Sequence, residues 1–485
     1  MGIKADGSMT ARRLRDPIGV STISNPTYTS VGADDGGQSM HRFVAELARC
    51  QGTVGDGIRA TLGMLQEHIP ITVHEVQSGT QIFDWTVPPE WKIRDAYIKD
   101  QSGERAVDIS DFNPRLVGYS APVRARMPLA ELRRHIFAAA ERLDWIPHPR
   151  SIDSEAWGFY LTHQEQRALS EGDYEVCVDT WLEPGHLTYG ECLLRGRSLE
   201  EVLISCHLRN PSFPNDNLSG AAVATALAQR LLSKRTRYSY RFLFIPSTIG
   251  AIAWIVLNQS RLFRIKHGLV LTQLGDSGQP TYQMTRHGDA EIDRVFAHVL
   301  KEAGQEFKVE PFSPCGDEER QYCSPGLDLP VGRFMRAPAP LGPPGQRDAG
   351  DLTSVQAESL DDSLGKLLSV IDMLEHNRRY LNQNPLCEPQ LSKYGLAPFR
   401  MDASAAEHHR ALLWVLNYSD GEHTLLDIVM RANLRWTAVK HAVSALCACG
   451  LLKAADRSAA RSPNGKRRRR RQGGPLAIAE PASSR

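Results

Sequence analysis

The chain has 485 residues, of which 41% are hydrophobic and 23% are charged, with 38 Gly and 29 Pro. This composition is typical of a globular protein of about two to four domains, and it excludes collagenous, coiled-coil and wholly disordered chains. The net charge of +1 hides an asymmetry, because residues 456–485 hold nine Lys or Arg against two acidic residues. The tail therefore carries +7 and the chain before it about −6.

The sequence speaks against membrane insertion and export. The longest apolar run, Phe242 to Leu257, is short for a membrane span and contains Pro, Ser and Thr. The N-terminus lacks the regions of a signal peptide. The nine unevenly spaced cysteines do not form a disulfide framework, and they indicate a reducing, cytoplasmic compartment.

In chain order, residues 1–38 are predicted to be a disordered leader, and helical periodicity begins at Met40. Residues 73–125 hold short segments rich in β-branched and aromatic residues, separated by turn residues, which predicts an inserted β-domain. The segments 174–182 and 187–194 predict a hairpin around Pro184-Gly185.

The segments 39–72 and 126–388 are predicted to form one α/β domain. Apolar runs at 201–206, 240–245 and 268–274 are typical of strands buried on both faces, and Val223, Leu227 and Leu231 form a helical stripe between the first two. This alternation predicts a central, mostly parallel or mixed sheet. Residues 389–455 hold three helical segments followed by a short strand, the outline of a winged helix, and residues 456–485 are predicted to be disordered.

Ligands of open α/β sheets bind at the carboxyl ends of the strands, which directs attention to three positions. His207 ends the first strand, and Asp216 follows on the loop into the helix, so the two could converge on zinc. Asp276 follows the third strand and is a further candidate ligand. Alternatively, Asp216 caps the helix, His207 is a polar loop residue and Asp276 is a turn residue.

An apparent loop at 315–326 concentrates acidic, Arg and Tyr side chains, with Asp317, Glu318, Arg320 and Tyr322 among them. Loops of this kind often carry function, although a solvated run of charges explains the pattern as well.

Several long motifs in the same order resemble one bacterial family, that of aminopeptidase-like proteins with an inserted β-domain and a C-terminal winged helix. They are His207 to Gly220, Phe244-Ile245-Pro246-Ser247-Thr248-Ile249-Gly250, Leu274-Gly275-Asp276, Asp317 to Gly326 and, in the insertion, His74 to Thr80 and Phe83 to Pro88. The resemblance covers residues 40–453. It implies a central domain similar to the co-catalytic zinc aminopeptidases, which bind two metal ions and use a glutamate base.

The resemblance also assigns roles to individual residues. His207 matches the first histidine ligand, Asp216 the bridging carboxylate and Asp276 a further family position. The family has Glu where this chain has Ser247, and a His where local alignment places Gln346.

With both substituted, the remaining ligands would hold one zinc ion rather than two, or none. Loss of a general base costs on the order of 10²–10⁴-fold in rate, and Glu318 is a candidate substitute base. Asp317, Arg320, Tyr322, Ser247 and Gln346 are expected to line the substrate site.

Three functions follow as expectations. The first is a divergent zinc-dependent hydrolase of an amide bond in a small peptide or aminoacyl biosynthetic intermediate. The second is a catalytically inactive protein that keeps the fold for binding or as a scaffold. The third is a winged-helix regulator that binds nucleic acid, although the third helix offers only Arg435, Lys440 and His441 for phosphates or bases. A protein partner is therefore expected for the winged helix, and neither nucleic acid nor a membrane.

Overall fold

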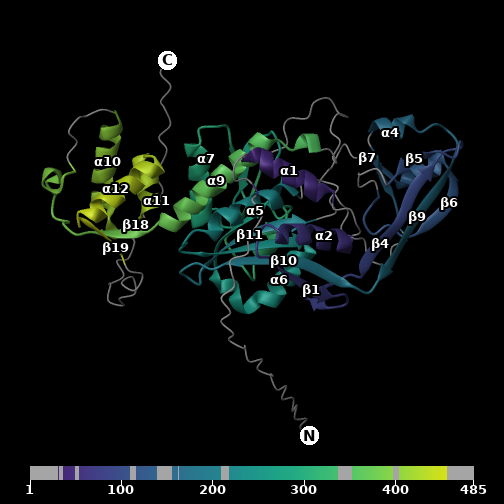
Figure 1. Cartoon of the computed structure of the whole chain (residues 1–485), viewed down its shortest axis with the longest axis horizontal. Coiled ribbons are helices and arrows are strands. Elements are labelled where there is room, and N and C mark those ends of the chain that lie inside the picture. Colours follow the sequence, from purple (N-terminus) through teal and green to yellow (C-terminus); the bar gives the residue numbers. More distant parts are fainter. Residues whose placement is uncertain are drawn as a thin grey trace, which may run out of the picture. The chain divides into compact units, whose positions relative to one another are not determined.

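The computed structural model describes residues 31, 36–49, 54–109, 116–138, 156–161, 163–208, 218–336, 352–396 and 403–455. The chain divides into two compact units. The first comprises residues 1–288 and 308–365, and the second residues 289–307 and 366–485 (Figure 1).

An eight-stranded sheet in the order β1-β10-β12-β11-β13-β16-β14-β15 forms the centre of the first unit. The three predicted apolar strands lie side by side and parallel in its middle, as β12, β11 and β13, and every residue of β11 is buried. The mixed α/β sheet expected from the sequence is therefore confirmed. The strand bounds are β1 Thr72–Gln77, β10 His186–Leu194, β11 Glu201–Leu208, β12 Ser239–Pro246, β13 Ile265–Leu271, β14 Pro280–Gln283, β15 Lys308–Glu310 and β16 Val331–Arg336.

Helices cover both faces of this sheet. Helix α6 packs against Leu203 and Leu243, whereas the Sγ of Cys206, on the opposite face of β11, lies 3.5 Å from the carbonyl oxygen of Gly220 in α5. A side chain at Gly220 would meet the carbonyl oxygen of Leu271 at 2.4 Å, so glycine lets α5 lie directly on β13. Among the described residues outside the inserted module, the helices that lie wholly in this unit are α1 Gly37–Ala48, α2 Val54–Gln66, α5 Ser219–Leu232, α6 Ile249–Asn258 and α8 Glu319–Tyr322, with 3-10 turns at Gln259–Arg264 and Leu352–Ser354.

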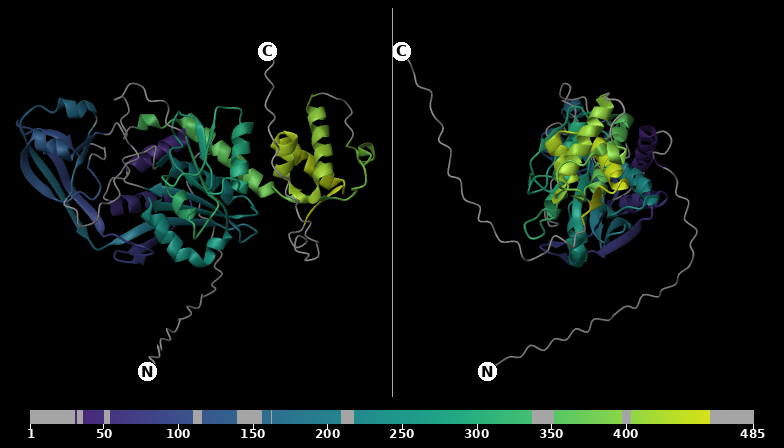
Figure 2. Two further views of the ribbon diagram at one scale, coloured as in Figure 1. Left: turned by 180° about the vertical axis from the view of Figure 1, so that it is seen from behind. Right: turned by 90° about the vertical axis from the view of Figure 1, so that its left-hand side faces the viewer.

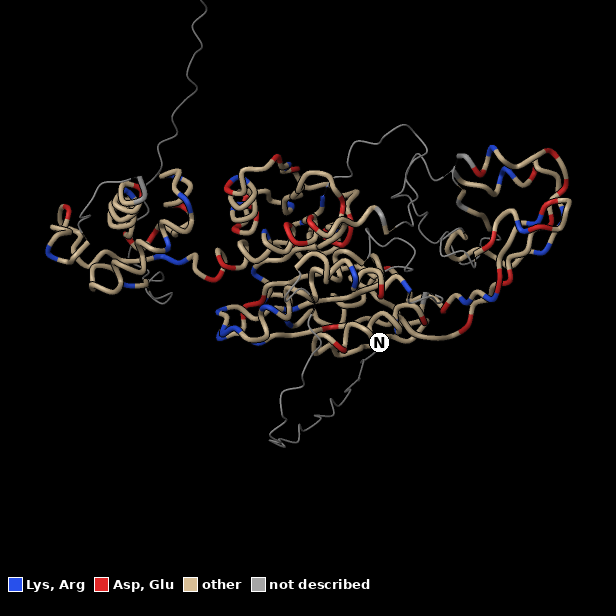
Figure 3. The backbone as a smooth tube through the Cα atoms, turned by 45° about the horizontal axis from the view of Figure 1, so that its top comes forward, with Lys and Arg blue, Asp and Glu red and all other residues tan. Residues whose placement is uncertain are grey.

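A second, four-stranded antiparallel sheet in the order β5-β4-β9-β6 forms the inserted module. It includes β9, which lies beyond the boundary at 125 expected from the sequence. Trp91, Ile98 and Val176 pack into a separate core, and acidic and basic residues are interspersed along the chain of this module (Figure 3). The elements are β4 Glu90–Lys99, β5 Arg105–Asp108, β6 Val123–Pro128, α3 Leu129–Leu132, a 3-10 turn Arg133–His135, β7 Ile136–Ala138, β8 Phe159–Leu161, α4 His163–Ala168 and β9 Asp173–Glu183, and the pair β2 Gln81–Ile82 and β3 Trp85–Thr86 precedes them.

The prediction of a hairpin around Pro184-Gly185 is wrong. Strand β9 pairs with β4 and β6, whereas β10 pairs with β1 and β12 in the central sheet. The turn instead lies against β4, where a side chain at Gly185 would meet Glu90 at 2.5 Å. The two strands are consecutive in the chain, but the apolar side chains of β9 and β10 pack into different hydrophobic cores.

Part of the second unit is a winged-helix fold, made of its last three helices and a three-stranded sheet in the order β18-β17-β19. Its third helix, α12, carries the side chains that the sequence offered for nucleic acid. Lys440 and the indole nitrogen of Trp436 both bind Asp372 of α9, at 2.7–2.9 Å, and Arg435 pairs with Glu407. The elements are α7 Glu291–Glu302, α9 Ala357–His376, which begins in the first unit, β17 Arg379–Asn382, a 3-10 turn Leu391–Tyr394, α10 Ala403–Tyr418, β18 Asp420–Thr424, α11 Leu425–Ala432, α12 Trp436–Ala448 and β19 Leu452–Ala454 (Figure 2).

Within the described residues, no helix is long and apolar enough to cross a membrane.

Candidate functional site

The carboxyl ends of β11, β12 and β13 meet at one edge of the central sheet. His207 is the penultimate residue of β11 and aligns with Ile245 of β12, so Ser247 begins the loop next to it. Asp276 follows β13, the parallel neighbour of β11 on the other side. These three candidates therefore lie at the carboxyl ends of the strands, as the sequence predicted.

A buried pair between His207 and Glu318 lies at the centre of this edge. The His207 Nδ1 and the Glu318 Oε2 are 3.0 Å apart, and both side chains are excluded from solvent, with exposed fractions of 1% and 0%. Glu318 reaches the histidine from the turn before α8, which lies 111 residues further along the chain.

The other oxygen of Glu318 is also engaged. Its Oε1 accepts hydrogen bonds from the Ser247 hydroxyl at 2.9 Å and from the Thr248 backbone N–H at 3.0 Å. Thr248 has a φ of 61°, in the left-handed region that branched side chains avoid. Burial alone would raise the pKa of Glu318, but His207 and these hydrogen bonds outweigh it and hold the pKa well below its usual range.

Glu318 therefore fits the role of a general base poorly. It is ionised at neutral pH, and both of its oxygens accept hydrogen bonds within the protein. Because a carboxylate can only accept, the Nδ1 of His207 must carry the proton of this hydrogen bond. In the neutral imidazole, Nε2 then carries the lone pair, which is how outer carboxylates orient histidines that bind metal ions.

Of the predicted metal ligands that the structure describes, only His207 is oriented as a metal-binding side chain would be. Among the described residues, no three His, Cys, Asp or Glu side chains come together as a metal site. Asp216 and Gln346 lie outside the described residues. The Asp276 side chain is buried and accepts from the Gly278 N–H at 2.9 Å, so it shapes the turn after β13, and its role as a ligand stays a prediction.

The remaining predicted substrate-site residues within the described ranges do not gather around one site, because each has a different environment. Tyr322 is fully buried, with its hydroxyl 3.0 Å from that of Ser205, which places it in the core rather than on a substrate surface. Asp317 pairs with Arg333 of β16 at 2.9 Å. Arg320 is partly exposed on α8. The Ser247 hydroxyl is committed to Glu318.

Sequence reasoning missed Glu319, the buried neighbour of Glu318. Its Oε1 accepts from the Asp317 N–H at 3.0 Å and lies 3.8 Å from the Arg333 guanidinium. Burial raises the pKa of Glu319 to about 7, against the lowering effect of Arg333. The glycine at 316 is the one signal for this packing, because a side chain there would overlap the Glu319 carboxylate.

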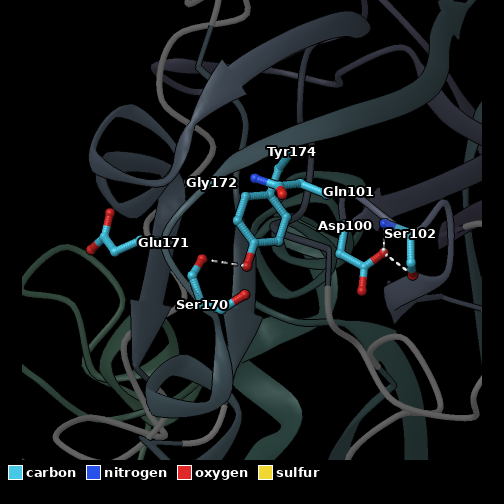
Figure 4. A pocket seen from close by; sticks show the side chains of 7 residues that line it. All are labelled: Asp100, Gln101, Ser102, Ser170, Glu171, Gly172 and Tyr174. Carbon is cyan, nitrogen blue, oxygen red and sulfur yellow. Dashed lines mark hydrogen bonds between the residues drawn. The ribbon is translucent and has the colours of Figure 1, made fainter.

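One small polar depression lies on the inserted module (Figure 4). The turns around Gln101 and Glu171 form it, with Tyr174 donating a hydrogen bond to the Ser170 carbonyl at 2.9 Å. It contains none of the side chains that the sequence assigned to the functional site.

Comparison with known proteins places the chain in a family. A domain of unknown function (DUF4910) matches residues 41–377, and a winged helix-turn-helix matches residues 378–454. A protein of Clostridium acetobutylicum is 42% identical over 431 residues, which is 88% of this chain and 98% of that protein, and it is provisionally named a polysaccharide biosynthesis protein with an aminopeptidase-like domain.

This chain belongs to that aminopeptidase-like family. A crystal structure of a protein from the same organism, provisionally named a peptidase, has a TM-score of 0.78 at 41% identity, and the match covers 86% of this chain and 96% of that one. The zinc aminopeptidase of Bacillus subtilis matches with a TM-score of 0.49 at 11% identity, over 70% of this chain and 94% of that one. The family model, the relative from Clostridium acetobutylicum and the winged helix-turn-helix match confirm the family and the winged helix predicted from the sequence.

Proposed function

We propose that this protein binds a small peptide or an aminoacyl conjugate at the carboxyl ends of β11–β13 and hydrolyses its amide bond slowly, with one zinc ion. The observation that carries the proposal is the buried contact of Glu318 with the His207 Nδ1 at 3.0 Å. This contact buries two polar side chains, which is unfavourable unless they are paired. It also leaves the Nε2 of the imidazole as the nitrogen that would bind a metal ion.

His207, Asp216 and Asp276 would hold the ion, a set of three protein ligands that suits catalytic zinc. Zinc in such a site lowers the pKa of a bound water and polarises a carbonyl group. The chain's own contribution is orientation, because Glu318 fixes the imidazole ring while Ser247 and Thr248 fix Glu318.

The slow rate follows from the missing base. Ser247 stands where the family has glutamate, and the oxygens of Glu318 are already engaged. The absence of a positioned base typically costs on the order of 10²–10⁴-fold.

A second candidate is a binding protein without catalysis. The Ser247 hydroxyl favours it, because it donates to Glu318 at 2.9 Å and so completes a network that needs no catalytic glutamate. Under this proposal the site would recognise the same class of ligand and release it unchanged.

Metal analysis combined with turnover assays on the full chain tests both candidates. The wild type should contain about one zinc per chain, His207→Ala should lose it, and aminoacyl p-nitroanilides should be cleaved slowly and in a chelator-sensitive way. Ser247→Glu should raise the rate by on the order of 10²-fold. Ser444→Glu, on the exposed face of α12, is the matched control and should change neither quantity.

The outcomes separate the candidates. Stoichiometric zinc without turnover in either the wild type or Ser247→Glu would favour the binding protein. A zinc content that is negligible, and unchanged by His207→Ala, would refute the metal-based proposal.

A further inference from the structure

A second surface lies at the opposite edge of the central sheet, where the chain enters β11, β12 and β13. We call it the amino edge, and it consists of residues 195–199, 230–237 and 257–266. Backbone hydrogen bonds join the first two stretches, from Arg197 N to Thr236 O at 3.1 Å and from Ser198 N to Arg237 O at 2.8 Å. The third stretch leads to Ile265, which aligns with Glu201 at the start of β11. The three stretches therefore form one continuous rim.

The amino edge is strongly basic. Its three stretches contain nine Lys or Arg and no Asp or Glu, although the chain before residue 456 carries about −6 in total. Lys and Arg are blue in Figure 3. Seven of the nine side chains are exposed and two are half-buried: Arg195, Arg197, Arg230, Lys234, Arg235, Arg261 and Lys266, with Arg237 and Arg264.

Each of the three stretches also exposes a large apolar side chain. Leu199 and Phe263 are the most exposed, at 65% and 69%, followed by Leu257 at 53% and Leu232 at 40%. The guanidinium of Arg264 lies 5.8 Å from the centre of the Phe263 ring. The backbone carbonyl of Phe263 accepts a hydrogen bond from the Lys266 ammonium group at 3.1 Å. Cations and apolar groups are thus interleaved along the whole rim.

This combination fits an anionic membrane surface better than other polyanions. Cations attract acidic headgroups, and exposed Leu and Phe gain free energy when they enter the boundary between headgroups and acyl chains. Nucleic acid binding would use the cations but leave four aliphatic or phenyl side chains in water. A surface contact needs no spanning segment, so it is compatible with the absence of a membrane-crossing helix among the described residues.

We propose that the amino edge docks the protein on membranes rich in anionic lipid, with Leu199, Leu257 and Phe263 inserted among the headgroups. The carboxyl ends of β11–β13 lie at the other end of these strands, so the candidate site would face away from the bilayer. The proposal does not depend on hydrolysis or on zinc.

Vesicle co-sedimentation of the full chain tests this surface. The wild type should bind vesicles of phosphatidylcholine with about 30% phosphatidylglycerol, and should bind phosphatidylcholine alone weakly. Because each cation near such a surface contributes about fivefold in affinity, Lys234→Glu with Arg235→Glu should weaken binding by more than about 25-fold. Phe263→Ser should weaken it by about tenfold.

Three controls isolate the amino edge. Phe83→Ser changes an equally apolar side chain, 55% exposed, on the β2–β3 turn, and Arg126→Glu with Arg133→Glu reverses two exposed charges on the inserted module. Replacement of Arg467 to Arg471 by Ser removes the basic run of the tail. All three should leave the affinity within about twofold.

Two results would overturn the proposal. One is vesicle binding that survives both amino-edge variants or disappears with the tail replacement. The other is tight binding of a short DNA duplex that Lys234→Glu with Arg235→Glu abolishes and Phe263→Ser leaves intact, which would assign the surface to nucleic acid.

Discussion

The contact between Glu318 and His207 predicts the effect of one isosteric change, Glu318→Gln. The carboxylate now accepts three hydrogen bonds, from the His207 Nδ1, the Ser247 hydroxyl and the Thr248 N–H. An amide has only one oxygen, so it cannot accept from both sides. If its oxygen keeps Ser247 and Thr248, its NH₂ group must donate to Nδ1. The proton of the neutral imidazole then moves to Nε2, and the lone pair that would bind zinc is lost.

The size of the effect follows from the same contacts. Loss of an outer carboxylate behind a metal-binding histidine typically costs 10–100-fold in affinity, so zinc should bind Glu318→Gln about 10–100 times more weakly. Since the pair is fully buried, the apo protein should also lose about 1.5–3 kcal/mol of unfolding free energy. Ser247→Ala removes one hydrogen bond and keeps the charge, so it should cost about 1 kcal/mol and change zinc affinity little.

Competition with a chromophoric chelator measures the zinc affinity, and urea unfolding in excess chelator measures the stability of the apo protein. Equal zinc affinity in the wild type and Glu318→Gln would refute the reasoning, since it would mean that the ring needs no carboxylate to bind the metal. A loss of affinity in Ser247→Ala as large as in Glu318→Gln would refute it as well.

Three further predictions concern stability. Arg241→Met should lower the unfolding free energy by about 3–5 kcal/mol in urea titrations, because it leaves the buried carboxylate of Glu201 and the half-buried carboxylate of Glu191 beside an apolar side chain. Glu319 has its pKa raised by burial to about 7, so its protonated form stabilises the fold fully below about pH 4.5. That stability should fall by up to about 3 kcal/mol as the pH rises through 7, and Glu319→Gln should flatten the profile; an unchanged profile would contradict the assignment. Gly220→Ala should lower the melting temperature by several degrees, since its Cβ would lie 2.4 Å from the Leu271 carbonyl oxygen, whereas Gly365→Ala in α9, with open space around it, should not.

The strands and the edge where they end could be predicted because they follow from local patterns. Apolar runs buried on both faces identify β11, β12 and β13, and parallel strands bring their carboxyl ends together. That reasoning predicted that His207, Ser247 and Asp276 lie at this edge without any knowledge of side-chain contacts. The winged helix followed equally from three periodic segments and a final strand.

The partners of these side chains could not be predicted, because they come from distant parts of the chain. Glu318 lies in a run of charges that resembles a solvated loop, and nothing in its own neighbourhood indicates that it reaches His207. The cations of α12 likewise resemble a weak nucleic-acid surface until Asp372, 68 residues from Lys440, is seen to bind one of them. The strand at 173–183 has an alternating pattern that fits either sheet, so only the packed core decides where it pairs.

The inserted module begins and ends at one point, and this bears on the order in which the chain folds. Glu90, the first residue of β4, pairs with Glu183, the last residue of β9. Just before this pair, Ser78 binds both backbone groups of Gly185, at 2.9 and 3.0 Å. Once the module has formed, the central sheet has to join β1 to β10 across a closed neck rather than across about a hundred free residues, which lowers the loss of chain entropy. The module can therefore fold first and act as a preformed turn for the hairpin that completes the central sheet.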